Sequence, residues 1–475
     1  MRNLYIIAAI LALLVGCTPK TKEAITIPQQ MENKIASIHI VNKDESLYKI
    51  ATKYGVTQEE LIEMNPALKN KKLKKGMKLY IPIATTKKEE VKKEEKPKVE
   101  TPVIVEEKKE QATIAIVLPF MLDKYAPTEQ ERMIEFYQGL LLAVESLKNE
   151  GLSFDIQTYD SGEATESLTT LINSGKLDKC DMIIGALYPA HNKQLATYAK
   201  AKNIPLVIPF SAKEDELYSN PKVFITNAIQ KYTIEKSVEK FHEQFPGANV
   251  IFVVNERDGE KKEFATELLK QLDKKSINHS TILIDSLMSM AGGDGNSYIV
   301  QHMDSNALNI FIPTSSKVET FNSVLPSLLV LKRDTIESVP EFILFGYPEW
   351  QIYAASNLEA MYEVDTYFYA SFYTNAILPE AIEIQEKYAK WYNRSMQNRY
   401  PRYGMLGYDT GYYFLKAISL YRENMAENIN KIIFTPSQLG FNFIRNNNRG
   451  GYINNKAYYV RYSPDYKVTK IDLDK

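Results

Sequence analysis

The fold is decided by the stretch Ala112-Thr113-Ile114-Ala115-Ile116-Val117-Leu118-Pro119-Phe120. Its apolar residues are continuous, which is typical of a strand buried on both faces of a parallel sheet. An amphipathic helix follows at Gln138–Leu147. Strand-like runs and helical segments then alternate along the chain, and such alternation produces parallel sheets with helices on both faces. The large C-terminal part of the chain is therefore predicted to be α/β.

Further strands and helices are expected along this part. Ligands of such sheets bind at the carboxyl ends of the strands. About 360 residues are too many for one sheet, so two lobes are expected. The predicted strands are Phe154–Tyr159, Asp181–Ile184, Ile204–Pro209, Asn249–Val254, Ile282–Asp285, Ala307–Ile312 and Glu341–Phe345, and the helices between them include Leu195–Lys202, Ile234–Phe245 and Lys261–Lys274.

Length and composition bound the organisation of the chain. A chain of 475 residues favours two or three domains, and 44% hydrophobic with 25% charged residues is a globular composition. The net charge of −1 argues against nucleic acid as a partner. The predicted parts are a signal peptide at 1–16, a tether at 17–35, a small module at 36–83, a Lys/Glu/Pro-rich linker at 84–111 and the large domain at 112–475.

The N-terminus has the pattern of a secretory signal. Arg2 supplies a positive charge, and the apolar run that follows is shorter than the roughly 20 residues that span a bilayer. Leu14-Val15-Gly16-Cys17 resembles a bacterial lipobox, which implies cleavage before Cys17 and acylation of its thiol. A cleaved soluble signal and an uncleaved short anchor are the alternatives. Because no Asp follows Cys17, we expect a lipid anchor in the outer membrane, facing the periplasm.

Residues 36–83 form a compact block of strand and helix signals. Ser37–Val41 alternates like a strand, a helix capped by Ser46 follows, and Thr57-Gln58-Glu59-Glu60 is a capping box for a second helix before a strand at Lys78–Pro82. This block resembles the LysM glycan-binding module. The residues that carry the resemblance are Asp44-Glu45-Ser46-Leu47-Tyr48-Lys49-Ile50-Ala51, Tyr54-Gly55-Val56, Asn65-Pro66, Leu73-Lys74-Lys75-Gly76-Met77-Lys78-Leu79 and Ile81-Pro82.

The LysM resemblance implies binding of peptidoglycan through its N-acetylglucosamine-containing glycan. The groove of the family lies between the loop before the first helix and the loop after the second. For individual groove residues, capping and packing of the module is an equally good interpretation. By position the groove would be formed by Asp44, Glu45, Ser46 and Leu47 on one side and by Met64, Asn65 and Pro66 on the other.

Several motifs of the large domain occur in a characteristic order: Asp160-Ser161-Gly162, Asp181-Met182-Ile183-Ile184-Gly185-Ala186, Asn203-Ile204-Pro205-Leu206-Val207-Ile208-Pro209-Phe210-Ser211, Gly404-Met405-Leu406-Gly407-Tyr408-Asp409-Thr410-Gly411 and Arg449-Gly450-Gly451-Tyr452. Their order and spacing resemble type I periplasmic binding proteins of the branched-chain amino-acid class. The resemblance implies two lobes that close on a ligand like a hinge and are joined by three chain crossings. We expect lobe 1 at about 112–229 and 376–436, and lobe 2 at about 230–375 and 437–475.

Ligand contacts of this family can be carried over by position. The first-lobe candidates are Tyr188, Ala190 and His191, after Gly185, and Ser211. The family gathers Ser or Thr hydroxyls in this turn, whereas here it reads Ala186-Leu187-Tyr188-Pro189-Ala190-His191. The sequence alone favours a surface or helix-cap position for His191. The second-lobe candidates are Glu256 and Glu349; Glu349 lies in a segment that resembles a family loop whose acid holds a ligand ammonium, but alone it reads as a solvated loop acid.

No catalytic constellation is recognisable in the sequence. The five histidines have no HxH or HExxH spacing, and the chain has no G-x-S-x-G or Walker-type motif. Cys180 precedes an apolar run and is expected to be buried. We therefore predict a protein that is not an enzyme and uses no cofactor and no metal.

Two functions remain open. The first is a lipid-anchored envelope protein that binds peptidoglycan through LysM and recognises a protein partner, such as a penicillin-binding protein or another wall synthase, through the two-lobed domain. The missing hydroxyls in the turn after Gly185 favour it. The alternative is a solute receptor that delivers a small amino-acid-like ligand, either an amino acid or a peptide, to an ABC importer.

Overall fold

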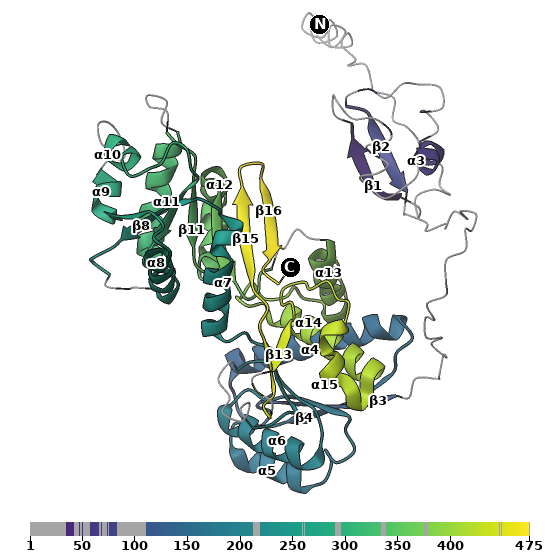
Figure 1. Ribbon diagram of the computed structural model, residues 1–475. Coiled ribbons are helices and arrows are strands. Elements are labelled where there is room, and N and C mark those ends of the chain that lie inside the picture. The colour runs from purple at the N-terminus through teal and green to yellow at the C-terminus, as the bar shows by residue number, and fades with distance from the viewer. Residues whose placement is uncertain are drawn as a thin grey trace, which may run out of the picture. The chain divides into compact units, whose positions relative to one another are not determined.

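The computed structural model describes residues 35–41, 47, 50, 58–65, 68, 74, 76–82, 111–211, 219–258, 260, 262–289, 296–333, 339–374, 379–445, 447 and 449–474. The chain forms two compact units, Met1–Ile104 and Val105–Lys475 (Figure 1). Cys17, Asp44, Glu45, Ser46 and Pro66 lie outside the described residues.

The first unit contains a two-stranded sheet and a helix. Strand β1 (Ile35–Ile40) pairs antiparallel with β2 (Lys78–Pro82), and helix α3 (Gln58–Met64) precedes β2 in the chain. Both strands and the second helix of the predicted module are confirmed. The buried apolar residues of this unit are Val41, Ile50, Leu61, Leu79 and Ile81, with Leu47, Leu68 and Met77 packed against them.

The second unit contains two seven-stranded sheets. The first has the strand order β13-β14-β7-β6-β5-β3-β4, in which every neighbouring pair is parallel except β13–β14. Its strands are β3 (Ala112–Leu118), β4 (Phe154–Asp160), β5 (Met182–Gly185), β6 (Leu206–Ile208), β7 (Val223–Ile225), β13 (Phe443–Arg445) and β14 (Tyr452–Asn454). The helices of this lobe are α4 (Pro127–Asn149), α5 (Thr165–Asn173), α6 (Pro189–Lys202), α13 (Pro379–Tyr392), α14 (Tyr403–Tyr421) and α15 (Met425–Asn428), with 3₁₀ turns η4 (Arg422–Asn424) and η5 (Ile429–Lys431).

The second sheet repeats the same plan. Its order is β16-β15-β12-β11-β10-β8-β9, with β8 to β12 parallel and β15 and β16 antiparallel to their neighbours. Its strands are β8 (Asn249–Val254), β9 (His279–Leu283), β10 (Asn309–Pro313), β11 (Phe342–Gly346), β12 (Thr366–Ala370), β15 (Tyr458–Ser463) and β16 (Lys467–Asp472). Its helices are α7 (Gln230–Gln244), α8 (Glu263–Lys275), α9 (Ile284–Ser289), α10 (Asn296–Val300), α11 (Val318–Lys332) and α12 (Trp350–Val364).

The first five strands of each lobe follow one another in the order second, first, third, fourth, fifth, which is a common order of doubly wound α/β sheets. The chain passes between the two sheets three times: after β7, after β12 and between β14 and β15. The predicted two-lobed type I fold with parallel sheets is confirmed by this topology.

One detail of the expected lobe limits is wrong. Lobe 2 was expected to hold all of 437–475, but β13 and β14 belong to the first sheet, where β14 lies beside β7. The reason is that the third crossing comes after Asn454 and not before residue 437. The other lobe boundaries stay predictions.

Helices α4 and α14 pack directly against each other through glycines. A Cβ on Gly139 would lie 1.8 Å from the carbonyl oxygen of Gly404, and one on Gly407 would lie 1.9 Å from that of Phe136. Only glycine allows backbones to approach this closely. This contact places the start of α14 against α4, and the first residues of both helices form part of the cavity described below.

Candidate ligand-binding sites

In the first unit, the structure describes three of the predicted glycan-binding residues. Asn65 is buried, and its amide nitrogen donates to the carbonyls of Leu61 (2.8 Å) and Tyr80 (2.6 Å), while its amide oxygen accepts from the Tyr80 N–H (2.7 Å). Asn65 therefore joins the end of α3 to β2. Leu47 packs against the core of the unit, and Met64 is partly exposed. Their contact with glycan stays a prediction.

In the first lobe, the turn after β5 is built on close backbone contact. A Cβ on Gly185 would lie 2.0 Å from the carbonyl oxygen of Val117, so only glycine fits there. The side-chain oxygen of Asn192 accepts the N–H of Ala186 at 2.9 Å, which ties the turn to α6. Tyr188 stands immediately before that helix, and Ala190 is exposed on its first turn.

His191 is fully buried, so the expected surface or cap position is wrong. Helix α6 begins at Pro189, which turns the third residue of the helix toward the backbone of Glu163 and Ala164. Its ring meets that of Tyr188 edge-on at 5.5 Å between centroids. Burial lowers the pKa of His191, so the imidazole is neutral at pH 7. The neutral ring packs against the ring of Tyr188.

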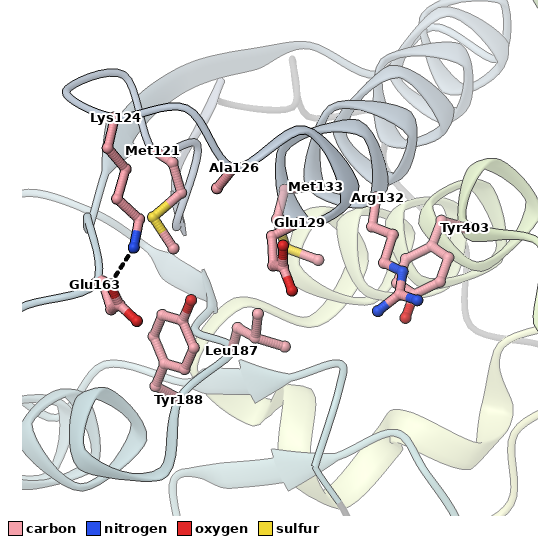
Figure 2. Close-up of a pocket in the computed structure, with 10 residues that line it drawn as sticks. All are labelled: Met121, Lys124, Ala126, Glu129, Arg132, Met133, Glu163, Leu187, Tyr188 and Tyr403. Carbon is pink, nitrogen blue, oxygen red and sulfur yellow. Dashed lines mark hydrogen bonds and ion pairs between the residues drawn. The ribbon is translucent and has the colours of Figure 1, made fainter.

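Tyr188 lines a cavity of about 550 Å³ at the carboxyl edge of the first sheet. Asp160 shapes one wall, because its carboxylate accepts backbone N–H groups from Phe120 (2.8 Å), Met121 (3.3 Å), Leu122 (2.9 Å) and Gly162 (2.9 Å). The cavity lies within the first lobe (Figure 2). The residues that line it are Met121, Lys124, Ala126, Glu129, Arg132, Met133, Glu163, Leu187, Tyr188 and Tyr403.

Two cationic side chains line this cavity, and they have different partners. At one end Lys124 forms an ion pair with Glu163. At the other end the guanidinium of Arg132 lies over the ring of Tyr403, 5.8 Å from its centroid. Burial, together with Glu163 and Glu129, raises the pKa of Tyr188, which keeps its hydroxyl protonated.

In the second lobe, Glu349 is already bound within the chain. Its Oε1 lies 2.6 Å from Nζ of Lys262, and that ammonium is also 3.7 Å from Glu260. The other oxygen of Glu349 is buried. Glu349 thus forms an ion pair with a cation of the chain, while 40% of its side chain stays exposed to solvent.

The remaining candidates differ in their surroundings. Glu256 is exposed after β8, and Ser211 is partly buried after β6. Of the predicted ligand contacts, Tyr188 lines the cavity of the first lobe. Sequence reasoning missed Arg132 and Tyr403, which lie far apart in the chain and meet only because α4 packs on α14. The glycines Gly139, Gly404 and Gly407 were a usable signal of that packing.

Among the described residues, no helix combines the length and apolar character that crossing a membrane requires. Within the same part of the chain, no group of three or more His, Cys, Asp or Glu side chains is arranged to hold a metal ion.

Comparison with known proteins identifies the first unit: residues 39–82 match the LysM domain family, so the predicted LysM module is confirmed. No curated protein matches the chain.

Several solved structures that are similar to the chain are described as ABC transporter proteins. One is assigned to a branched-chain amino acid ABC transporter of Rhodospirillum rubrum (11% identity, 76% of this chain and 100% of that one, TM-score 0.49). Another is a branched-chain amino acid ABC transporter periplasmic ligand-binding protein of Burkholderia xenovorans LB400 (13% identity, 77% of this chain and 96% of that one, TM-score 0.43). A third is an ABC transporter substrate-binding protein of Desulfitobacterium hafniense in complex with Leu (14% identity, 76% of this chain and 100% of that one, TM-score 0.41). At these identities their ligands say nothing about a ligand of this chain.

Proposed function

We propose that this chain is a lipid-anchored, non-enzymatic envelope protein that binds peptidoglycan through its LysM domain and recognises a wall protein through its two-lobed domain. The LysM domain supports the first part, since this family binds N-acetylglucosamine-containing glycan. The signal-like N-terminus and Cys17 support export and an outer-membrane anchor that faces the periplasm.

The ion pair between Lys262 and Glu349 is the observation that carries the second part. An amino-acid receptor of the resembling family would need a free acid for the ligand ammonium. Here the counter-ion comes from the chain itself, 87 residues away in sequence. The turn before α6 also offers no hydroxyl other than that of Tyr188. Both features favour protein recognition over capture of a free amino acid, and a penicillin-binding protein or another wall synthase is the partner class.

A thermal-shift measurement on the full chain with free amino acids tests this choice. A ligand at about 100 times its dissociation constant adds about 2.7 kcal/mol of stability, which shifts the melting temperature visibly. We expect no shift with any free amino acid. A shift that Glu349→Gln abolishes, and that the exposed control Glu341→Gln retains, would contradict the proposal and make the chain a solute receptor.

A positive test uses a photo-crosslinking amino acid at Tyr125, which is highly exposed beside the cavity. We expect cross-links in cells to a penicillin-binding protein or another wall synthase. Cross-links confined to the permease of an ABC importer would support the receptor instead.

A further inference from the structure

The cavity of the first lobe holds a cation that no part of the described chain neutralises. The guanidinium of Arg132 forms no ion pair among the described residues, and its Nε is buried there without a hydrogen-bond partner. Burying a charge without a partner is costly, and a carboxylate removes that cost with two parallel hydrogen bonds. Arg132 is therefore suited to an anionic group that enters from outside.

Arg132 is also held in place. Its guanidinium lies over the ring of Tyr403, and that ring is stacked on Phe210 at 6.0 Å between centroids. Phe210 in turn meets Phe136 of α4 at 4.8 Å. An arginine fixed on an aromatic stack loses little side-chain entropy when it binds, so the site is pre-organised.

Other groups in the cavity match the remaining parts of a peptide. Glu129, one turn before Arg132 on α4, points into the cavity in Figure 2 and forms no ion pair among the described residues. Its carboxylate and the hydroxyl of Tyr188 can accept peptide N–H groups. Met121, Met133 and Leu187 supply apolar surface between the polar ends, and methionines adapt to side chains of different shape.

The size and rim of the cavity agree with a short segment. A volume of about 550 Å³ lies within the range of small-ligand pockets. Beside it, Leu122 and Tyr125 expose 82% and 88% of their surface. The loop that carries these two residues is anchored at its start, because the carboxylate of Asp160 accepts the N–H groups of Phe120, Met121 and Leu122. The two exposed side chains can thus extend the contact beyond the cavity.

We propose that this cavity binds a carboxylate-bearing peptide segment of the partner, with Arg132 holding the carboxylate and Glu129 and Tyr188 accepting its N–H groups. The proposal rests on the proposed function, since it names the chemistry by which the two-lobed domain recognises a protein. The carboxylate can be a C-terminus or an acidic side chain.

Equilibrium dialysis of the full chain against three pools of N-acetylated tripeptides tests the proposal. The first pool has free C-terminal carboxylates, the second is amidated with Glu at the central position, and the third is amidated and carries no acid. Mass spectrometry measures which peptides are retained. We expect at least about tenfold higher retention of an acidic pool than of the neutral pool, the size of one charge-assisted hydrogen bond. The preferred acidic pool identifies the source of the carboxylate.

Variants attribute the effect to Arg132. Arg132→Gln should abolish the preference, and Arg132→Lys should weaken it because the planar fork is lost. Arg445→Gln is the matched control, since Arg445 lies 5.8 Å from the Tyr452 ring but outside the cavity. Melting temperatures establish whether each variant is folded. If a variant does not fold, the comparison of the three peptide pools on the wild-type protein still tests the proposal.

Equal retention of the three pools, retention of none, or an undiminished preference in folded Arg132→Gln would each overturn the proposal. None of these results bears on the amino-acid shift or the cross-links that test the proposed function. Failure of the site and failure of the function are therefore distinguishable.

Discussion

Asp409 is a buried side chain that stabilises a segment close to a connection between the lobes. On α14, its carboxylate accepts the N–H groups of Ser437 (2.9 Å), Gln438 (2.8 Å) and Leu439 (2.7 Å). The carbonyl of Gln438 accepts the N–H of Tyr373, which lies in the second crossing between the lobes (3.1 Å). Asp409 therefore connects the helix that lines the cavity to a segment that joins the lobes.

The stability contributed by Asp409 should depend on pH. Burial outweighs the hydrogen bonds and raises its pKa to about 6, above the ordinary 3.8. Between these values the folded state binds more protons than the unfolded state, so stability falls as pH rises from about 4 to 6, by about 3 kcal/mol in all. Urea unfolding at pH 4.5 and 7 should show about 2 kcal/mol of this fall relative to Asp409→Asn, because the first part of the fall is already complete at pH 4.5. A difference that is independent of pH would contradict it.

The site residues that sequence could not predict are those whose partner lies far away in the chain. Glu349 was a candidate ligand contact, and nothing in its local sequence indicates that it forms an ion pair with Lys262. His191 lies in a helix with many polar residues, so the sequence favours an exposed position. Its burial comes from packing near the backbone of Glu163 and Ala164. Tyr188 was predicted because it follows a glycine turn at a strand end, where local sequence and topology agree.

At the scale of elements, most strands of the parallel parts of the two sheets were predicted, whereas β7, β12 and the C-terminal strands β13 to β16 were not. The continuous apolar runs of β3 and β8 begin where expected, at Ala112 and Asn249. The strand β7 was missed because it has only three residues. The hairpin β15–β16 was missed because Arg461, Thr469 and Lys470 interrupt the apolar residues of its strands. The predicted strand Ile282–Asp285 is shifted, because Ile284 already begins α9 and the strand is His279–Leu283.

The packing of α4 on α14 gives a prediction at this scale. Gly139→Ala places a methyl group 1.8 Å from a backbone oxygen, which no rotamer change can relieve. We expect the free energy of unfolding to fall by about 3 kcal/mol or more. Lys148→Ala, at an exposed position of α4, should change it by less than about 0.5 kcal/mol. Equal stability of Gly139→Ala and the wild type in urea unfolding would show that the helices are not in this contact.

At the scale of the whole molecule, the LysM module and the two-lobed domain were predictable because each has its own motifs and periodicity. The linker between them stays a prediction. The third crossing was placed too early, since the short strands β13 and β14 leave little trace in the sequence. The cavity of the first lobe depends on contacts among distant residues, which periodicity does not reveal.

The proposed lipid anchor gives a prediction at this scale as well. Cys17→Ala should abolish incorporation of a labelled fatty acid when the chain is made in cells. Cys180→Ala is the matched control and should keep the label, because Cys180 is buried and burial raises the pKa of its thiol to about 11. Label on the Cys17→Ala protein, or none on the wild type, would contradict the anchor.

The most direct test of the account is sedimentation of the full chain with purified peptidoglycan, compared with a variant that lacks residues 36–83. We predict that the full chain sediments and is released by soluble N-acetylglucosamine oligomers, because the proposed function assigns glycan binding to the LysM domain at 39–82. The variant should stay in the supernatant. Equal sedimentation of the two proteins would contradict the claim that LysM holds this protein on the cell wall.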